Sequence, residues 1–599
     1  MSGKYLPHNV QREIREDGSI ILRSGYGLSD YVSKSGDWLD DWAARTPDAV
    51  FIAERSGPAW REVSYGQARE MVRALASSLL ARGLGSDTPI MILSGNGVDH
   101  GLLSLAAQYA GIPTVPLAEQ YSLIPAANGQ ITYCADLVKP KLVFADDAAK
   151  YAGALALDVF EGVEKVASRN AGNGVTSFED LLKGDSGVDL DAVAAKVGPD
   201  TVAKYLMTSG STSNPKAVIT TQRMICANQS QIADAMPFLR ARPPRIVDWL
   251  PWNHVFGGSH NFNMMLANGG SLYIDAGKPV KALVGQTIEN NRLMNGTLAF
   301  NVPVGFAMLR DAMREDAELR QRYFSDLDMI FYAGASLPQD VWADLEAMSR
   351  EVRGDVPLMT SSWGMTETAP ACLIVHEPTT ASGIIGVPMT GCEVKLIPDE
   401  DMRCDLRVRG PNITPGYFQN DEKTQELFDE EGFLISGDAV KFVDAEDINL
   451  GLRFDGRISE DFKLMTGTWV RAANLRLELL GELAPLCQDI VICGADKSEI
   501  GLFIFPSPEA LAMADGAEDA NGALTSEALS KAVIAKLEGR KSQGSASRIS
   551  RALVLSEPPS MGDGEMTAKG NLNFRKILTR RAGLLARLYD DADQSVIHI

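Results

Sequence analysis

Two hydrophobic periodicities alternate along most of the chain, and this alternation limits the folds that it can adopt. Val63 to Gly83 places apolar residues at helical spacing, and Gly83 ends the segment. The apolar run Pro89 to Leu93 predicts a buried strand, Asp99 to Ala110 predicts a helix, and Ile112 to Leu117 returns to an extended pattern. A strand, a helix and a strand in this order predict a parallel strand pair joined by a right-handed crossover.

The alternation continues through further apolar runs, at Leu142 to Ala145, Arg245 to Leu250, Ser271 to Ile274, Leu298 to Val302, Met329 to Tyr332 and Pro357 to Thr360. This pattern predicts a layered α/β body. Near residue 390 it gives way to short strands, at Glu393 to Ile397, Leu406 to Arg409, Gly432 to Ile435 and Val440 to Val443. We therefore predict an α/β fold with a large multi-layered N-terminal domain, residues 1–456, that contains a β-rich subdomain. A small α+β C-terminal domain is expected over residues 457–599, ending in a helix from Phe574 to Leu588.

Composition excludes several classes of partner. The 599 residues include 57 Lys and Arg against 78 Asp and Glu, a net charge of −21, which argues against binding a nucleic acid or an anionic membrane. No apolar run reaches the roughly 18 residues of a membrane span, and no secretory signal begins the chain. Seven scattered cysteines without a CxxC pair predict reduced thiols and a cytoplasmic location. Six dispersed histidines argue against a metal cluster.

A loop rich in glycine and hydroxyl groups is the most informative segment. Tyr205 to Ala217 runs from an apolar strand through small polar residues to Pro-Lys and a second apolar run. Hydroxyls, backbone N–H groups and one ammonium gathered so closely suit a phosphate chain, although the spacing is not that of a Walker A loop. A Ser/Thr-rich linker is the alternative. The expected phosphate ligands are Thr208, Ser209, Gly210, Ser211, Thr212 and Lys216.

This loop resembles the phosphate-binding motif of the adenylate-forming enzymes, which include acyl-CoA synthetases, firefly luciferase and peptide-synthetase adenylation domains. Ser213 and Ala217 depart from it, since each replaces a glycine of the usual motif. Ser361 to Thr368 is similar to a second motif of the family. There the resemblance implies that Trp363 lies beside adenine, that Thr366 contacts phosphate and that Glu367 binds Mg²⁺.

Further motifs follow in the family's order. Tyr332 to Ala335 resembles the glycine turn that approaches the base and the acyl group, through Gly334 and Ala335. Pro251 to Gly258 resembles the segment beside the acyl pocket. The resemblance implies that Asp438 and Arg457 contact the ribose. The residues expected to bind the acid are His254, Phe256, Asn263, Gly334, Gly364 and Met365; Asn263 or the Ser361–Ser362 pair could bind a phenol hydroxyl.

The C-terminal domain carries the resemblance in an unusual form. Ser459 stands at the position of the family's hinge, where Asp or Lys is usual, and Lys463 matches a basic residue of many acyl- and aryl-CoA ligases. The adenylating lysine usually follows a glycine near the end of the chain, but here the nearby lysine is Lys569, which precedes Gly570. These features resemble the feruloyl-CoA synthetase branch. Lys569, Lys463, Thr366 and His254 are the expected catalytic residues, and the C-terminal domain is expected to be mobile.

The resemblance implies an acid–CoA ligase that uses ATP, Mg²⁺ and coenzyme A. A small carboxylic acid, with ferulate or another hydroxycinnamate expected, would form an acyl-adenylate and then a CoA thioester. The alternatives are a medium-chain fatty acid or a benzoic acid as substrate, a carrier-protein acceptor, or a nucleotide-binding protein without activity. The chain ends at Ile599 without a carrier domain, which favours free CoA. The oligomeric state stays open, with a homodimer as one option.

Overall fold

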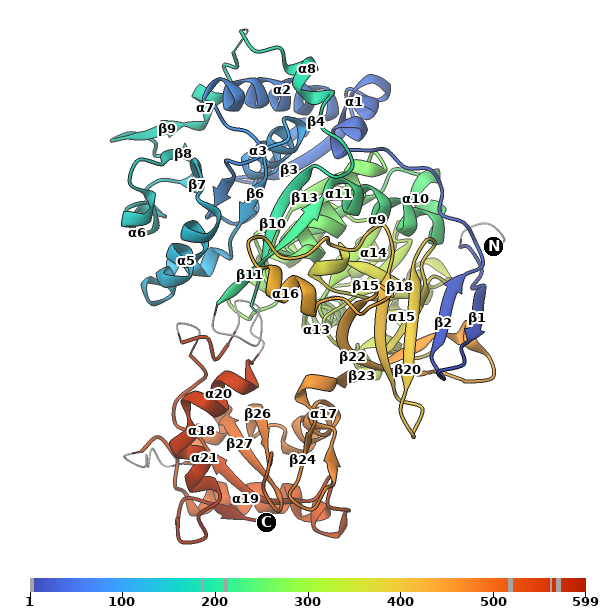
Figure 1. The fold of residues 1–599 in the computed structure, drawn as a ribbon, viewed down its shortest axis with the longest axis vertical. Helices are drawn as coiled ribbons and strands as arrows, with labels where there is room; N and C mark the ends of the chain where they lie inside the picture. The colour runs from blue at the N-terminus through green and yellow to red at the C-terminus, as the bar shows by residue number, and fades with distance from the viewer. Residues whose placement is uncertain (1–4, 186, 210–213, 515–520, 561–562, 567–571) are drawn as a thin grey trace.

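A computed structural model describes residues 5–185, 187–209, 214–514, 521–560, 563–566 and 572–599. The chain forms a large N-terminal body and a smaller C-terminal body beneath it (Figure 1). The predicted α/β fold class is confirmed. Within these residues no helix is both long and apolar enough to cross a membrane. All seven cysteines are free, and six of them are buried.

The first sheet contains the predicted strand–helix–strand unit. β5 (Ile90–Ile92) and β6 (Thr114–Pro116) pair in parallel, with α3 (Val98–Tyr109) between them in sequence. The helix forms because its apolar residues recur at helical spacing, and most of its side chains are buried. The sheet has seven strands, in the order β11 (Pro215–Thr221), β10 (Val202–Ser209), β6, β5, β7 (Leu142–Asp147), β8 (Glu164–Arg169) and β9 (Val175–Ser177). β10 and β11 form the antiparallel edge hairpin that carries the predicted phosphate loop.

Two smaller sheets complete the α/β layers. The first has the order β12 (Arg245–Asp248), β13 (Ser271–Ile274), β3 (Val50–Ser56) and β4 (Ala59–Ser64). The second is parallel, with β14 (Leu298–Asn301), β15 (Met329–Tyr332) and β16 (Leu358–Thr360). Helices α2 (Tyr65–Ala81), α9 (Gln222–Ala235), α13 (Pro303–Glu315) and α15 (Gln339–Arg353) pack around them. Every strand predicted in this part of the chain is present.

The β-rich region is a nine-stranded sheet that draws its strands from two parts of the chain. Its order is β1 (Val10–Ile14), β2 (Ile20–Ser24), β20 (Glu393–Pro398), β21 (Cys404–Arg409), β22 (Leu434–Phe442), β23 (Leu452–Arg457), β19 (Ile384–Pro388), β18 (Ala371–Ile374) and β17 (Ser362–Gly364). Two strands predicted separately near 432–435 and 440–443 are one strand, β22, and that part of the prediction is wrong. The chain continues through Gly437, whose φ of +72° allows an irregularity instead of a turn.

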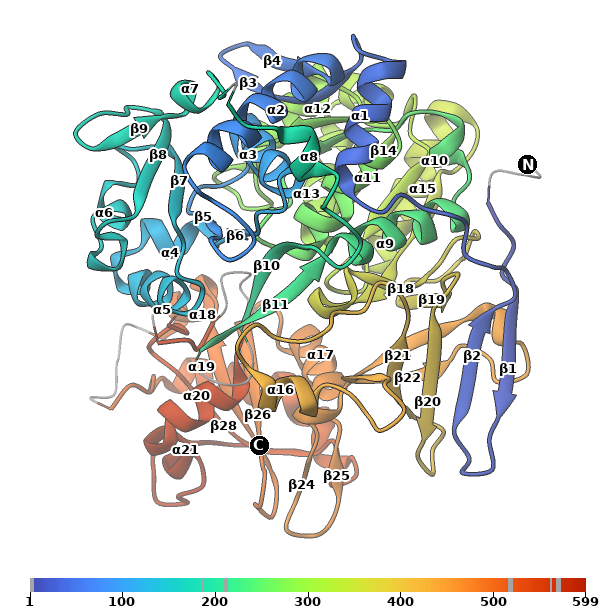
Figure 2. The ribbon, with the colours of Figure 1, turned by 45° about the horizontal axis from the view of Figure 1, so that its top comes forward.

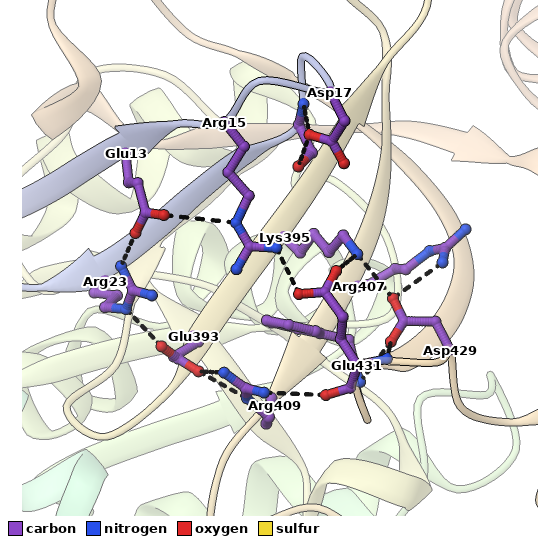
Figure 3. Close-up of polar contacts among 12 residues, drawn as sticks. Glu13, Arg15, Asp17, Arg23, Glu393, Lys395, Arg407, Arg409, Asp429 and Glu431 are labelled. Atoms are coloured by element: carbon purple, nitrogen blue, oxygen red, sulfur yellow. Dashed lines mark hydrogen bonds and ion pairs between the residues drawn. The ribbon is translucent and has the colours of Figure 1, made fainter.

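An ion-pair network ties the hairpin β1–β2 to this sheet (Figure 3). Arg23 donates to Glu393 at 2.5 Å and to Glu13 at 2.8 Å, and Glu393 also pairs with Arg409. Arg15 contacts Glu431 at 2.6 Å. The same carboxylate pairs with Lys395, which also lies 3.2 Å from Asp429. Charged side chains that alternate in sign across neighbouring strands thus join residues about 370 apart in sequence.

The C-terminal domain is a mixed sheet with helices on both faces. Its strands are β26 (Cys487–Cys493), β27 (Ile500–Pro506), β28 (Ile549–Val554) and β29 (Ile597–His598). Successive residues of β26 point to opposite faces. Ile490 and Ile492 therefore join the core beneath α17 (Ala472–Leu483) and α19 (Glu527–Leu537), whereas Val491 and Cys493 join the core beneath the last two helices.

The predicted single tail helix is wrong. The structure has α20 (Phe574–Arg580) and α21 (Ala582–Leu588), interrupted at Arg581. The Arg581 guanidinium is buried and makes two hydrogen bonds to Glu565, at 2.7 and 2.8 Å. The chain therefore turns inward at this residue to satisfy a buried carboxylate.

The two domains meet around β23, which ends at Arg457, and the short hairpin β24 (Phe462–Lys463) and β25 (Trp469–Val470) follows. Arg403 of the N-terminal domain lies 2.9 Å from Asp455 and 2.8 Å from Asp461, whose side chain is only 6% exposed. Two views show α20 on the side of the C-terminal domain nearer to β11, and the β24–β25 hairpin on the side farther from it (Figures 1 and 2).

Candidate functional site

The predicted ribose and adenine residues meet in the nine-stranded sheet. Asp438 of β22 is paired in register with Arg457 at the end of β23. The Trp363 indole N–H donates to one Asp438 oxygen at 2.9 Å, and Arg457 Nε lies 3.4 Å from the other. Burial raises the pKa of Asp438, and the neighbouring Arg457 opposes that rise. The tryptophan therefore positions a buried carboxylate of the kind that accepts hydrogen bonds from a diol.

The predicted phosphate lysine and the predicted metal ligand are joined by a tyrosine. Lys216 Nζ donates to the Tyr417 hydroxyl at 2.9 Å and lies 4.0 Å from the centre of its ring. The hydroxyl donates in turn to Glu367 at 2.8 Å. Burial lowers the pKa of Lys216, while burial and the Glu367 charge raise the pKa of Tyr417. Tyr417 could not be found from sequence motifs, because it lies 50 residues from Glu367 and about 200 residues from Lys216 along the chain.

The loop that presents Glu367 depends on Gly364 for its path. A Cβ on Gly364 would lie 1.7 Å from the Pro370 carbonyl oxygen, so no other residue fits there. Thr366 begins a short 3₁₀ turn (Thr366–Thr368), and both Thr366 and Glu367 are buried. Met365 is partly buried against the main core. Gly334 and Ala335 are exposed just after β15, where Gly334 takes a φ of +89°.

The predicted acid-binding segment contains a π-helix, Phe256–Asn261, that the sequence did not reveal. His254 lies just before it and accepts from the Phe256 backbone N–H at 3.3 Å, and Asn263 lies just after it. The Phe256 ring packs 5.5 Å from Phe331, which stands on β15 three residues before Gly334. Single π-turns are frequent at functional sites, because the extra residue alters which side chains point inward.

A buried lysine fixes this π-helix to the first sheet. Lys204 of β10 donates to the Gly258 carbonyl at 2.7 Å, and burial lowers its pKa to about 7. Asn263 donates to the Ser259 carbonyl at 2.9 Å. Asn263, which was predicted to bind a phenol hydroxyl, thus donates its amide N–H₂ to the backbone. Its side-chain oxygen has no hydrogen-bond partner among the described residues.

The C-terminal site residues do not join these groups. Ser459 is exposed in the 3₁₀ turn Ile458–Glu460, and Lys463 is exposed on β24 with its ammonium 4.9 Å from the Trp469 ring. Lys569 lies outside the described residues, as do Gly210, Ser211 and Thr212. Thr208 and Ser209 end β10, where the Thr208 hydroxyl donates to the Lys216 carbonyl at 3.4 Å.

The donor set suits Mg²⁺ held mainly by phosphates. In the part of the chain that the structure describes, no three His, Cys, Asp or Glu residues are grouped as a metal site. Mg²⁺ commonly takes one or two carboxylates and completes its shell with phosphate oxygens and water. Glu367 would supply the carboxylate, with Lys216 beside it as a second positive charge.

Comparisons with known proteins identify the family of this chain. The family described as AMP-binding enzyme matches residues 39–418. A carboxylic acid reductase of Segniliparus rugosus is 26% identical, over 89% of this chain and 47% of its own length. Thus the chain spans about half of that relative. The 4-coumarate–CoA ligase 5 of Oryza sativa subsp. japonica is 26% identical over 72% of this chain and 76% of its own.

Solved structures share the fold. The A domain of the Segniliparus rugosus carboxylic acid reductase, in complex with AMP and a co-purified carboxylic acid, superposes with a TM-score of 0.68. That alignment covers 93% of this chain and 94% of the other at 19% identity. The resemblance to adenylate-forming enzymes is confirmed at the level of family and fold.

Proposed function

Since this chain belongs to the AMP-binding enzyme family, we propose that it is an ATP-dependent ligase that joins an aromatic carboxylic acid to coenzyme A. The reaction passes through an acyl-adenylate, and AMP and pyrophosphate are released. The observation that carries the proposal is the contact chain from Lys216 through Tyr417 to Glu367. It supports the proposal, because it joins a cation, which would suit a nucleotide's phosphates, to a carboxylate, which would suit their metal.

In the first half-reaction, a carboxylate oxygen of the acid attacks the α-phosphorus of ATP, and the bond to pyrophosphate breaks. Trp363, Asp438 and Arg457 would hold the nucleoside, and Lys216 would stabilise the charge that moves to pyrophosphate. Mg²⁺ bound with Glu367 would neutralise phosphate charge. Thr366 and the residues of the loop from Thr208 to Thr212 would complete the phosphate contacts.

In the second half-reaction, the CoA thiolate attacks the acyl carbon and AMP leaves. A turn of the C-terminal domain about Ser459 would separate the two steps, with Lys569 serving the first. Met465 and Trp469 are strongly exposed on the β24–β25 hairpin. These exposed apolar side chains support a role for the hairpin in contacts that form only after the C-terminal domain has turned for the second half-reaction.

The aromatic acid class rests on the resemblance to feruloyl-CoA synthetases and on the aromatic lining of the π-helix segment. Phe256, Phe331 and Phe300 pack together beside the predicted pocket, at centroid distances of 5.3 to 6.1 Å. The 4-coumarate–CoA ligase 5 of Oryza sativa is a relative whose name gives an aromatic acid as its substrate.

A second candidate is an adenylating enzyme that passes its acyl group to a carrier-bound thiol for reduction. The alignment with the carboxylic acid reductase favours it, because it covers 89% of this chain. Both candidates share the adenylation step, and they differ in the acceptor.

The test measures pyrophosphate release and thioester formation with ATP, Mg²⁺ and a panel of ferulate, coumarate, caffeate, cinnamate, benzoate and octanoate. We expect acid-dependent pyrophosphate release, and CoA thioester from the hydroxycinnamates. Pyrophosphate release without CoA consumption would favour the carrier-bound acceptor. Octanoate outperforming every cinnamate would overturn the acid class, and no release with any acid would overturn the activity.

The role of Lys569 has its own test. We expect Lys569→Ala to lower adenylation by about 10²-fold or more, because a cation is lost from the charged transition state. Thioester formation from a supplied acyl-adenylate should survive. Lys463→Ala is the comparison, and equal loss of both half-reactions in Lys569→Ala would mean that another lysine serves adenylation.

A further inference from the structure

Buried polar atoms without partners gather on and beside the π-helix. Ser259 Oγ, His260 Nε2, Asn263 Oδ1 and Gln229 Oε1 are buried, and none has a hydrogen-bond partner among the described residues. Leaving a buried polar group without a hydrogen bond destabilises the fold, so a cluster of them indicates a requirement other than stability. Of the four, His260 is surrounded by aromatic rings.

A chain of side chains fixes the tautomer of His260. Asn261 donates from its amide nitrogen to Asp248 at 3.1 Å, which turns the Asn261 oxygen toward His260. That oxygen lies 2.8 Å from His260 Nδ1, so Nδ1 carries the proton and donates. Burial lowers the pKa of His260 to about 4, so the ring is neutral at physiological pH. His260 Nε2 is therefore an acceptor with a free lone pair.

The surroundings of that acceptor are flat and apolar. The His260 ring lies 5.1 Å from Phe331, 5.6 Å from Phe256 and 5.6 Å from Phe300. Phe256 belongs to the predicted acid-binding segment. Gly334 and Gly364, which are also expected to bind the acid, are exposed, whereas His260 is fully buried. An acid that keeps its charged carboxylate at the exposed glycines would extend its ring toward buried His260.

We propose that His260 determines acid specificity by accepting a hydrogen bond from a hydroxyl on the substrate's ring, at the position farthest from the carboxylate. This inference rests on the proposed function and narrows its substrate to 4-hydroxylated aromatic acids. A neutral imidazole with a protonated Nδ1 can recognise only a donor. An apolar pocket with a built hydrogen-bonding group rejects an analogue that lacks the matching group, because the protein's own polar atom is then left unpaired.

The first test needs no variant. The rate constant kcat/KM for pyrophosphate release is measured with 4-hydroxycinnamate, 4-aminocinnamate, 4-methoxycinnamate and cinnamate. We expect the two acids that carry a donor to exceed the other two by about tenfold, the effect of one hydrogen bond. A methoxy acid used as well as the hydroxy acid would overturn the inference. Pyrophosphate release that depends on acid but shows no preference for donors would overturn only this inference. No pyrophosphate release with any acid would overturn the proposed function.

The second test separates specificity from structure. His260→Leu should remove the preference for donors, by lowering kcat/KM for the hydroxy acid about tenfold more than for the methoxy acid. His260→Gln keeps an acceptor and should retain part of the preference. His376 is another buried histidine, packed on His8 at the N-terminal segment, so His376→Leu serves as the control. It should leave the ratio between acids unchanged. Equal losses for all four acids in His260→Leu would show a structural role only.

Discussion

Tyr417 links two side chains whose roles were each predicted from separate motifs. With its hydroxyl between them, Lys216 and Glu367 do not contact each other directly. In the proposed function, this spacing would leave the lysine's other protons for phosphate and would keep the carboxylate near the same site for a metal. Tyr417 is therefore a positioning residue.

We expect Tyr417→Phe to raise the KM for ATP and the Mg²⁺ concentration for half-maximal rate by about 5- to 30-fold. The phenylalanine removes two hydrogen bonds and lets the lysine pair directly with Glu367. The value of kcat should fall less. Tyr109→Phe, at the end of α3, is the control. It removes a hydroxyl that is hydrogen-bonded to Asp40 and Arg73. If Mg²⁺ dependence stayed as in the wild type, Tyr417 would have only a packing role.

Asp248 gives the fold a distinctive pH response. Burial raises its pKa from 3.8 to about 7, so the folded protein holds a proton that the unfolded chain gives up. Its contribution to stability is full below pH ~3.8 and is lost as pH rises through about 7, at up to about 1.4 kcal/mol per pH unit.

Asp248→Asn removes this titration. The unfolding free energy of the wild type should therefore fall relative to that of the variant between about pH 5 and about pH 7, as measured by urea unfolding. The slope is the readout, because any packing cost of the amide does not change with pH. Asp200→Asn, at an exposed carboxylate paired with Arg223, is the control. Parallel curves for Asp248→Asn and the wild type would refute the prediction.

At the scale of elements, local patterns predicted strands and helices well and failed where distant contacts decide the path. β13 and β15 match their predicted bounds because each is a short apolar run between turns. Two predicted strands form the single strand β22, because its pairing with β21 and β23 keeps the chain extended on both sides of Gly437. The π-helix at Phe256–Asn261 and the break at Arg581 depend on buried partners supplied by other segments.

In the site, too, local motifs predicted some residues, whereas those that depend on distant contacts were missed. The motifs predicted Trp363, Asp438 and Arg457 as site residues, and the structure places them in contact. Tyr417 was not found, because it acts through Lys216 and Glu367, which are distant from it in sequence. His260 was not found, because it lies in a π-helix whose irregular geometry the sequence pattern does not reveal.

The ion-pair network on the nine-stranded sheet predicts a salt-dependent stability. Glu393 contacts both Arg23 and Arg409, so Glu393→Ala breaks two pairs between β20 and its neighbours. We expect a loss of about 1 kcal/mol in the free energy of unfolding at low salt, and a smaller loss in 1 M NaCl, where ion pairs are screened. Glu527→Ala removes a single exposed pair with Lys531 and is the control. A loss that is independent of salt would assign the effect to packing.

At the scale of the whole molecule, Arg403 holds the two domains in the observed orientation. It reaches Asp455 on β23 and Asp461 beyond the predicted hinge. In this orientation α20 lies on the side nearer to β11, and the β24–β25 hairpin lies on the far side (Figure 2). Lys463 belongs to β24. We infer that the contact favours adenylation over thioester formation.

Arg403→Ala should slow pyrophosphate release in a single turnover by roughly 3- to 10-fold, the effect of about 1 kcal/mol on a domain equilibrium. Thioester formation from a supplied acyl-adenylate should not slow. Asp461→Asn, which leaves no buried charge unpaired, should act in the same direction. Arg476→Ala breaks a pair with Asp489 inside the C-terminal domain and is the control. Equal slowing of both half-reactions by Arg403→Ala would show that it does not bias the orientation.

The attachment of β1–β2 to the nine-stranded sheet has a consequence for synthesis on the ribosome. Arg23 is translated about 370 residues before its partner Glu393. At about 5–20 residues per second, the hairpin waits roughly 20–70 seconds for the strand that it must join. During that interval its backbone edge and its charges face water or transient partners. The nascent chain is therefore expected to complete its first sheets early and to close this one late, just before the C-terminal domain emerges.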